Sequence, residues 1–231
     1  MLLSIIIPVF NEEKYVKKIL EKIKKIDDID KEVIVINDGS NDNTLNILKN
    51  ECKHLVDVLI NNKINRGKGY ACRVGIKKAN GKIVLIQDAD LEYNPDNYRK
   101  LLKPILEKKT KVVYGSRVLG RGKRTRPATI DFKIRYLANI FLTYLSNKMN
   151  KQNLTDAHTC YKVFSSKIIK DIKLEENGFC FCPEITAKIS KKKETILEVP
   201  IDYFGRTHKE GKKIKFLDGL KAIKSIIKYN L

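Results

Sequence analysis

Acidic side chains are scarce in this sequence relative to basic ones. The 231 residues carry 27 aspartates and glutamates against 47 lysines and arginines, which gives a formal net charge of +20. A surface this basic attracts polyanions such as nucleic acid, acidic lipid and nucleotide phosphates. Codon bias toward Lys, Asn and Ile would produce the same excess, so charge alone does not choose the partner.

Cysteines and long apolar runs are also few or missing. The five cysteines are odd in number and form no CxxC pair, which argues against a zinc site or a disulfide framework and favours reduced thiols. No apolar run approaches the ~20 residues of a membrane-spanning helix. The apolar start, residues 1–8, lacks the basic segment of a signal peptide and predicts a first strand. We therefore expect a cytoplasmic chain without a transmembrane segment.

Short β-branched runs alternate with amphipathic segments along the first half of the chain. Such alternation is typical of α/β units around a largely parallel sheet with right-handed connections. Ligands bind beyond the carboxyl ends of the strands in such sheets, and every polar motif of this half follows a strand. The predicted strands cover residues 2–9, 32–36, 56–60, 83–86 and 111–114, and the predicted helices cover residues 11–26, 42–48, 65–79 and 96–106.

The second half has a different character. Neither a repeat nor a linker divides it from the first, so the sequence predicts one domain over residues 1–231, with a functional division into residues 1–115 and 116–231. The apolar stripe of the helix at 131–150 leaves three alternatives open: packing on the sheet, a homodimer contact, or a position at a membrane interface. The predicted elements are a Gly- and Arg-rich loop at 115–129, helices at 131–150, 184–192 and 216–229, strands at 160–164 and 194–199, and a basic loop at 205–213.

Two carboxylates, Asp88 and Asp90, end the apolar run at 83–86. Alternate residues at the end of a strand point the same way, so these carboxylates can converge on one point. Hard oxygen ligands there suit Mg²⁺ or Mn²⁺ carrying a phosphate. A solvated turn is the alternative, because Asp, Asn and Pro are turn residues, and the spacing alone does not decide between the two.

The remaining motifs carry a resemblance. The chain resembles family 2 glycosyltransferases with the GT-A fold, a Rossmann-like α/β domain with a mostly parallel sheet flanked by helices. The segments TDAHTCYKVF, FCPEITAKI and VPIDYFGRTHKEGKKI are most similar to the branch of polyprenyl-phosphate (dolichol-phosphate) mannosyl- and glucosyltransferases. Sugar nucleotidyltransferases share the fold, but their first loop is Gly-rich and bears an Arg, unlike residues 8–12 here. The motifs that carry the family resemblance are SIIIPVFNEE at 4–13, VINDGSNDNT at 35–44, NRGKGYA at 65–71, DADLEYNPD at 88–96 and GSR at 115–117.

The resemblance implies an inverting transfer from a UDP- or GDP-sugar. It implies Mg²⁺ or Mn²⁺ on the donor diphosphate, held by Asp88, Asp90 and Glu92. Asp38 would bond the base, although a turn with a helix cap also explains it, and Asn37 stands where the family usually has Asp. The positions that it places around the donor are Pro8, Val9, Asn11, Glu12, Asp38, Lys68, Asp88, Ala89, Asp90, Arg117, Arg206 and Lys212.

For catalysis the resemblance points to Asp90, through the cation, and to Arg117, which can give phosphate the bidentate contacts that Lys cannot. Arg121, Arg124 or Arg126 would join it from the loop. A hydroxyl acceptor needs a carboxylate base, for which Asp156 is favoured over Glu184. A lipid phosphate is already an anion and needs no base.

The acceptor implied by the resemblance is a polyprenyl phosphate, with the basic helices peripheral on an anionic membrane surface, where each basic residue adds ~1 kcal/mol. A sugar or other hydroxyl acceptor is the alternative. A basic nucleic-acid-binding protein is a rival from another class, but the sequence has no recognition motif and no interleaved aromatics, so no specific nucleic acid is expected. The intact carboxylate pair argues against a degenerate, inactive scaffold.

Overall fold

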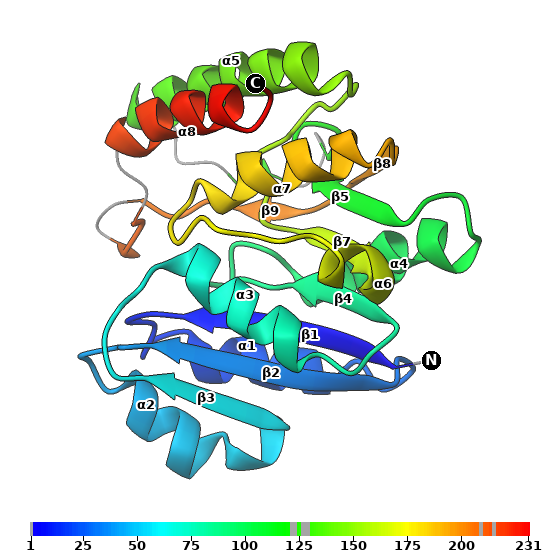
Figure 1. Cartoon of the computed structure of the whole chain (residues 1–231). Helices are drawn as coiled ribbons and strands as arrows, with labels where there is room; N and C mark the ends of the chain where they lie inside the picture. Colours follow the sequence, from blue (N-terminus) through cyan, green and yellow to red (C-terminus); the bar gives the residue numbers. More distant parts are fainter. Residues whose placement is uncertain (1, 121–123, 126–129, 208–209, 214–215) are drawn as a thin grey trace.

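The structure is a computed structural model of the chain, and it describes residues 2–120, 124–125, 130–207, 210–213 and 216–231. Its centre is a twisted sheet with helices on both faces (Figure 1). Within the described residues the sheet has seven strands in the order β3-β2-β1-β4-β7-β5-β8. These are β1 (Leu3–Val9), β2 (Lys31–Asp38), β3 (Val58–Asn62), β4 (Ile83–Ile86), β5 (Val112–Ser116), β7 (Lys162–Ser165) and β8 (Ile196–Pro200).

Strand β7 runs against the direction of the others. It pairs antiparallel with both β4 and β5, whereas the remaining neighbours in the sheet are parallel. A separate parallel ribbon joins β6 (Arg124–Thr125) to β9 (Tyr203–Phe204). The predicted α/β fold with a mostly parallel sheet is therefore confirmed, and the antiparallel strand is the detail that the alternation of helices and strands did not reveal.

Both faces of the sheet are covered, which explains why its strands are apolar runs. Along β1, Ile5 and Ile7 enter one core and Ile6 enters the other. The helices α1 (Val16–Lys24) and α4 (Tyr98–Leu106) pack into the first core, and α3 (Lys68–Lys78), α6 (Ser166–Lys170) and α7 (Phe181–Lys191) pack into the second.

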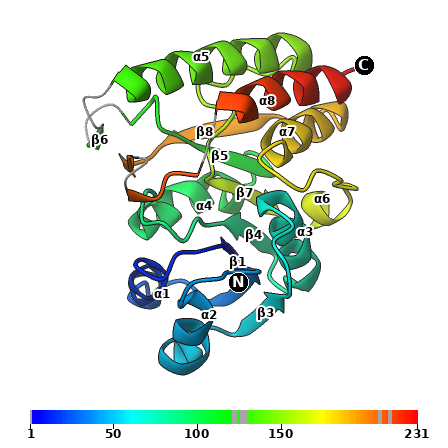
Figure 2. The same cartoon turned by 90° about the vertical axis from the view of Figure 1, so that its left-hand side faces the viewer.

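Two further helices lie over α7 as an outer layer (Figures 1 and 2). They are α5 (Ile130–Asn150) and α8 (Phe216–Lys228), joined by a small cluster that includes Leu142, Ala222 and Ile226. The apolar residues along α5 differ in exposure, because Leu142 is buried while Leu137 and Tyr144 are each 64% exposed. The stripe therefore does not pack on the sheet as a whole.

Several predicted boundaries were wrong. The helix expected from residue 11 begins at Val16, because residues 11–15 form turns in which Asn11 has a φ of 51° and the Tyr15 N–H donates to the Glu12 carbonyl over 3.0 Å. The helix predicted at 42–48 is a short α2 (Thr44–Asn46) that continues as a π-helical turn, Ile47–Glu51.

Candidate active site

Three carboxylates follow β4 at the carboxyl edge of the sheet. Each is paired with a cation from another part of the chain. Asp88 accepts from Lys68 at the start of α3, and Asp90 accepts from Arg206 over 2.7 Å. Glu92, which is 2% exposed, accepts from Lys212 over 2.8 Å. The sequence-predicted acidic and basic residues thus meet in one place, although their positions span more than half of the chain.

Arg206 is the centre of this network. Besides Asp90, its guanidinium bonds both carboxylate oxygens of Glu12, over 3.1 and 3.3 Å. Its backbone N–H donates to Glu92 over 2.9 Å, and its guanidinium carbon lies 5.1 Å from the centre of the Tyr15 ring. The Nε atom of Arg206 is buried and has no hydrogen-bond partner among the described residues. One arginine therefore connects the loop after β1 with the loop after β4.

Neighbouring residues complete the arrangement. Tyr203 donates its hydroxyl proton to Glu92 over 2.9 Å, and Lys213 donates to Glu12 over 2.6 Å. Lys68 also lies 2.9 Å from the thiol sulfur of Cys160. Cys160 and Tyr203 lie in segments that carry the resemblance, TDAHTCYKVF and VPIDYFGRTHKEGKKI, but sequence reasoning assigned neither of them a role in the site.

Charge crowding perturbs the carboxyl groups in opposite directions. Burial, together with the nearby Glu92 and Asp88 charges, raises the pKa of Asp90 to about 7. Burial opposes ionisation of Asp88 as well, but the Lys68 ammonium, the Cys160 thiol and the Lys212 charge together outweigh it, and the pKa of Asp88 is lowered. A carboxylate whose ionisation is opposed by two acidic neighbours is stabilised by additional positive charge.

This donor set fits a divalent cation in its chemistry, because three carboxylates supply the hard oxygens that Mg²⁺ and Mn²⁺ prefer. As they stand, no three acidic, histidine or cysteine side chains in the described parts of the chain converge on a point that could hold a metal. Asp88, Asp90 and Glu92 are each turned to a cation of the chain instead.

Asp38, at the end of β2, holds the turn before α3. Its two carboxylate oxygens accept from the backbone N–H groups of Arg66 (3.0 Å) and Gly67 (2.7 Å) and from the side chain of Asn62 (2.8 Å). Gly67 has a φ of 98°, a conformation that other residues rarely adopt. Asp38 thereby fixes the turn that presents Lys68, which leaves its predicted contact with a nucleobase untested.

A second ion pair lies on the other side of the carboxylates. Arg117, after β5, bonds Asp156 through Nε (2.6 Å) and Nη2 (2.7 Å), and its backbone N–H donates to the same carboxylate over 3.0 Å. Asn139 of α5 donates a further bond over 3.1 Å. Asp156 is fully buried, and although burial opposes its ionisation, Arg117 lowers its pKa. The guanidinium of Arg117 also faces the Tyr203 ring at 5.3 Å.

The other predicted site residues take several positions. Val9 and Ala89 are buried, and Pro8 is half-buried at the end of β1. Asn11 bonds the loop after β2, through its side chain to the Asn41 N–H over 2.9 Å. The side chains of Arg121, Arg124 and Arg126 lie outside the described residues.

Glu184, the second candidate base, serves the fold. It is fully buried and accepts from the backbone N–H groups of Glu175 (2.7 Å) and Glu176 (2.9 Å) and from Lys188 (2.7 Å).

All five cysteines are free.

Large apolar side chains are exposed on the outer helix pair. None of the described helices is both long enough and apolar enough to cross a membrane. Basic side chains lie along the same layer, among them the exposed Lys221 and Lys224 of α8. The exposed apolar residues are Ile134, Leu137, Ile140, Phe141 and Tyr144 of α5 and Leu217, Leu220 and Ile227 of α8.

Solved structures share this architecture. Glucosyl-3-phosphoglycerate synthase from Mycobacterium tuberculosis, in complex with phosphoglyceric acid, superposes with a TM-score of 0.74 at 16% identity, covering 99% of this chain and 79% of that one. The same enzyme in complex with Mn²⁺ and UDP-glucose gives a TM-score of 0.71 at 16% identity, covering 99% and 78%. The chain therefore has the GT-A fold of glycosyltransferases.

Sequence comparison identifies the family of glycosyltransferases to which the chain belongs. The model of glycosyl transferase family 2 matches residues 4–173, so the chain belongs to that family and is a glycosyltransferase. Similar proteins include dolichyl-phosphate beta-glucosyltransferase ALG5A of Trichomonas vaginalis, 28% identical over 98% of this chain and 72% of that protein. Another is the UDP-N-acetylglucosamine–dolichyl-phosphate N-acetylglucosaminyltransferase of Methanococcus voltae, 29% identical over 87% of this chain and 84% of that protein. The predicted resemblance to the dolichol-phosphate branch is confirmed.

Proposed function

We propose that this glycosyltransferase moves a sugar from a UDP- or GDP-sugar to a polyprenyl phosphate, with inversion at the anomeric carbon. The observation that carries the proposal is the row of carboxylates after β4, Asp88, Asp90 and Glu92, each paired with a cation of the chain: Lys68, Arg206 or Lys212. The names of the relatives supply the acceptor class.

The cations of the network suit an anionic donor. A diphosphate that binds beside the start of α3 would offer oxygens to Lys68, Arg206 and Lys212, whose charges are now balanced by Asp88, Asp90 and Glu92. Asp88, Asp90 and Glu92 would then be released to hold Mg²⁺ or Mn²⁺. The metal would neutralise the charge that develops on the leaving diphosphate.

Arg117 is the group that we assign to the acceptor phosphate. Its guanidinium is fixed by Asp156 and lies beside Tyr203, whose hydroxyl bonds Glu92 of the donor side. In the transfer, an acceptor phosphate oxygen bonds the anomeric carbon while the bond from that carbon to the donor phosphate breaks. The electron pair leaves with the nucleoside diphosphate, and no proton has to be removed from the acceptor.

Asp156 then positions Arg117 and is not a general base. Its carboxylate accepts three bonds from Arg117 and one from Asn139, and its pKa is lowered. A base needs a lone pair directed at the acceptor and a pKa near the working pH. Its geometry is therefore better suited to an acceptor that needs no deprotonation than to a sugar hydroxyl.

The two halves of the chain share this work. Residues 1–115 supply most of the donor contacts, and residues 116–231 supply Arg117 for the acceptor, with Arg206 and Lys212 reaching back to the donor side. The exposed apolar residues of α5 and α8 would lie against the membrane that holds the acceptor, with the lysines of α8 attracted to anionic headgroups. This makes the protein peripheral on a membrane.

The test is transfer itself. Incubation with UDP-glucose, UDP-N-acetylglucosamine or GDP-mannose, a polyprenyl phosphate and Mn²⁺ should yield a polyprenyl-phosphate sugar with one of the donors. If product forms only on an acceptor with a free hydroxyl group, the acceptor is a hydroxyl compound and the proposal of a lipid phosphate is wrong.

A further inference from the structure

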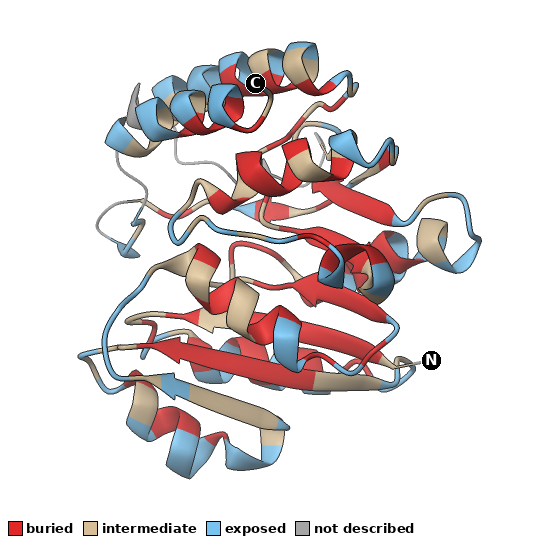
Figure 3. Cartoon of the chain, viewed as in Figure 1, coloured by how far each residue is buried: buried red, intermediate tan, exposed pale blue. Residues whose placement is uncertain are grey.

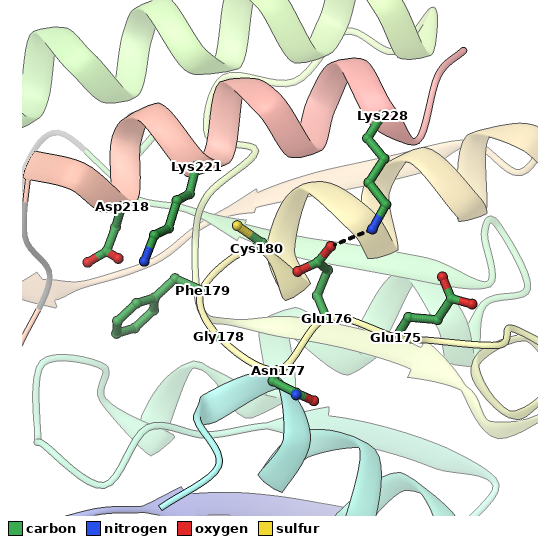
Figure 4. A pocket seen from close by; sticks show the side chains of 9 residues that line it. All are labelled: Glu175, Glu176, Asn177, Gly178, Phe179, Cys180, Asp218, Lys221 and Lys228. Atoms are coloured by element: carbon green, nitrogen blue, oxygen red, sulfur yellow. Dashed lines mark hydrogen bonds and ion pairs between the residues drawn. The ribbon is translucent and has the colours of Figure 1, made fainter.

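A cleft of about 460 Å³ lies between α8 and the loop that precedes α7 (Figure 4). It takes no part in the carboxylate network. From α8, Asp218 and Lys221 extend toward the ring of Phe179 on the opposite wall. The lining residues are Glu175, Glu176, Asn177, Gly178, Phe179, Cys180, Asp218, Lys221 and Lys228.

The loop wall of this cleft is rigidly held. The buried carboxylate of Glu184 accepts from the backbone N–H groups of Glu175 and Glu176, and the Asn177 carbonyl accepts from the Tyr70 N–H over 3.0 Å. Glu176 is fixed in turn by the Tyr229 hydroxyl, which donates to its carboxylate over 2.8 Å. Polar groups fixed before a ligand arrives lose little entropy on binding, which is the condition for a specific site.

The cleft adjoins the first turn of α3. A Cβ on Gly67 would lie 2.5 Å from the Asn177 carbonyl oxygen, so the turn and the loop are in direct contact. The same turn carries Lys68, whose ammonium bonds Asp88. The cleft is therefore separated from the proposed donor site by a single turn of helix.

Gly178 lies in the cleft wall, and neither packing nor backbone conformation requires a glycine at this position. A Cβ there would meet nothing within 4 Å, and its φ is not in the left-handed region. Glycine costs backbone entropy, and one of its uses is close approach of the backbone to a ligand. At Gly69, by contrast, a Cβ would meet the Glu176 carbonyl at 2.4 Å, which explains that glycine by packing alone.

The polar lining is unsuited to a phosphate. The lining contains three carboxylates and two lysines, and one of these lysines, Lys228, is already bonded to Glu176 over 3.1 Å. Carboxylate and amide oxygens accept from hydroxyl groups, and the ammonium of Lys221 donates to them. Phe179 adds an apolar ring face beside these groups. A neutral ligand with many hydroxyls and an apolar face of C–H groups matches this set, and a hexose ring has both.

We propose that this cleft is a carbohydrate subsite that binds a neutral hexose ring, stacked on Phe179 and hydrogen-bonded by Glu176, Asp218 and Lys221. The choice of hexose rests on the proposed function. The ring could belong to the nucleotide-sugar donor or to a separate sugar, such as the one on the product, and the chemistry of recognition is the same for both.

The experiment titrates the whole chain with methyl β-glucoside, methyl α-mannoside and methyl N-acetyl-β-glucosaminide, followed by saturation-transfer NMR. At least one glycoside should bind. Phe179→Ala and Lys221→Ala should each weaken its binding by roughly tenfold, whereas Lys224→Ala, an exposed lysine of α8 outside the cleft, should not. The proposal is overturned if no glycoside binds the wild type, or if a glycoside binds the wild type and all three variants equally. Displacement of the glycoside by inorganic phosphate would also overturn it.

Two further arms separate the sources of the ring. If it belongs to the donor, UDP-glucose displaces the glycoside, and Phe179→Ala weakens UDP-glucose but leaves UDP unchanged. If it belongs to another sugar, glycoside and UDP-glucose bind together. UDP or GDP binding, measured on the same variants, also confirms that they are folded. If the wild type shows no transfer activity, the proposed function is refuted, but the result of the glycoside titration still stands.

Discussion

Arg117 and Asp156 are joined by two parallel side-chain hydrogen bonds, Nε to Oδ2 over 2.6 Å and Nη2 to Oδ1 over 2.7 Å. The carboxylate is fully buried, while the side chain of the arginine keeps 17% of its exposure. This asymmetry is suited to an arginine that is fixed from behind and offers its remaining surface to a ligand. Arg117 is then the contact, and Asp156 determines where it lies.

The stability of this pair can be tested directly. Arg117→Met leaves the buried carboxylate of Asp156 without its cation and should lower the free energy of unfolding by about 3–5 kcal/mol. The double variant Arg117→Met/Asp156→Leu removes the stranded charge and should recover most of that loss. Urea denaturation of the three proteins measures both effects. Equal destabilisation of the single and double variants would show that the unpaired charge of Asp156 is not the cause of the lost stability.

The pH profile distinguishes the two roles of Asp156. As a positioning residue, Asp156→Asn should lower kcat by roughly 10–100-fold, because a misplaced catalytic group is costly even when the shift is small. The acidic limb of the profile should stay where it is in the wild type, since no proton passes through Asp156. Disappearance of that limb in the variant would identify Asp156 as the general base after all.

The buried His158 should make the fold sensitive to acid. Burial is the main reason that its pKa falls to about 4, with the Lys162 charge adding to the effect. Because the unfolded chain takes up this proton near pH 6.5 and the folded chain does not, stability is unaffected above pH 6.5 and is lost as the pH falls toward 4. The loss should reach about 3 kcal/mol. In His158→Phe, the unfolding free energy measured over this range should fall less steeply than in the wild type, and parallel curves would refute the assignment.

Membrane attachment should depend on the outer helices. Leu137→Glu places a charge on the exposed apolar face of α5 and should reduce sedimentation with anionic vesicles by about tenfold or more, the value of one large apolar side chain. Leu106→Glu, at the end of α4, is the matched control, because Leu106 is 54% exposed but lies outside the helix pair. Raised salt should weaken binding of the wild type. If both variants bind vesicles like the wild type, α5 does not face the lipid.

The sequence was most informative where a pattern has one physical meaning. Buried β-branched runs followed by polar motifs predicted the sheet and the edge that carries Asp88 and Asp90. The pairing of Asp88 with Lys68 and of Asp90 with Arg206 could not be predicted, because it depends on how distant loops return to that edge. Figure 3 shows the other limit: the sequence left open whether the apolar stripe of α5 packs on the sheet, forms a dimer contact or lies at a membrane interface, and in the structure much of the outer surface of α5 is exposed.

Tyr203 illustrates why sequence reasoning missed part of the site. It lies in β9, a two-residue strand that no periodicity could reveal, and its hydroxyl bonds Glu92 while its ring faces Arg117. For Asp38 the sequence offered both a contact with the base and a turn, and the structure shows the turn, because its carboxylate accepts from the backbone N–H groups of Arg66 and Gly67 before α3. The contact with the base stays a prediction.

The most direct test of the whole account is mass-spectrometric detection of a polyprenyl-phosphate sugar after incubation of the protein with nucleotide-sugar, polyprenyl phosphate and Mn²⁺. The wild type should form the product with a UDP- or GDP-sugar. Asp88→Asn/Asp90→Asn should form it at least ~100-fold more slowly, because the charge on the leaving diphosphate would no longer be balanced. Product formed at the same rate by the double variant would contradict the role of the carboxylates, and no product with any donor would contradict the proposed reaction.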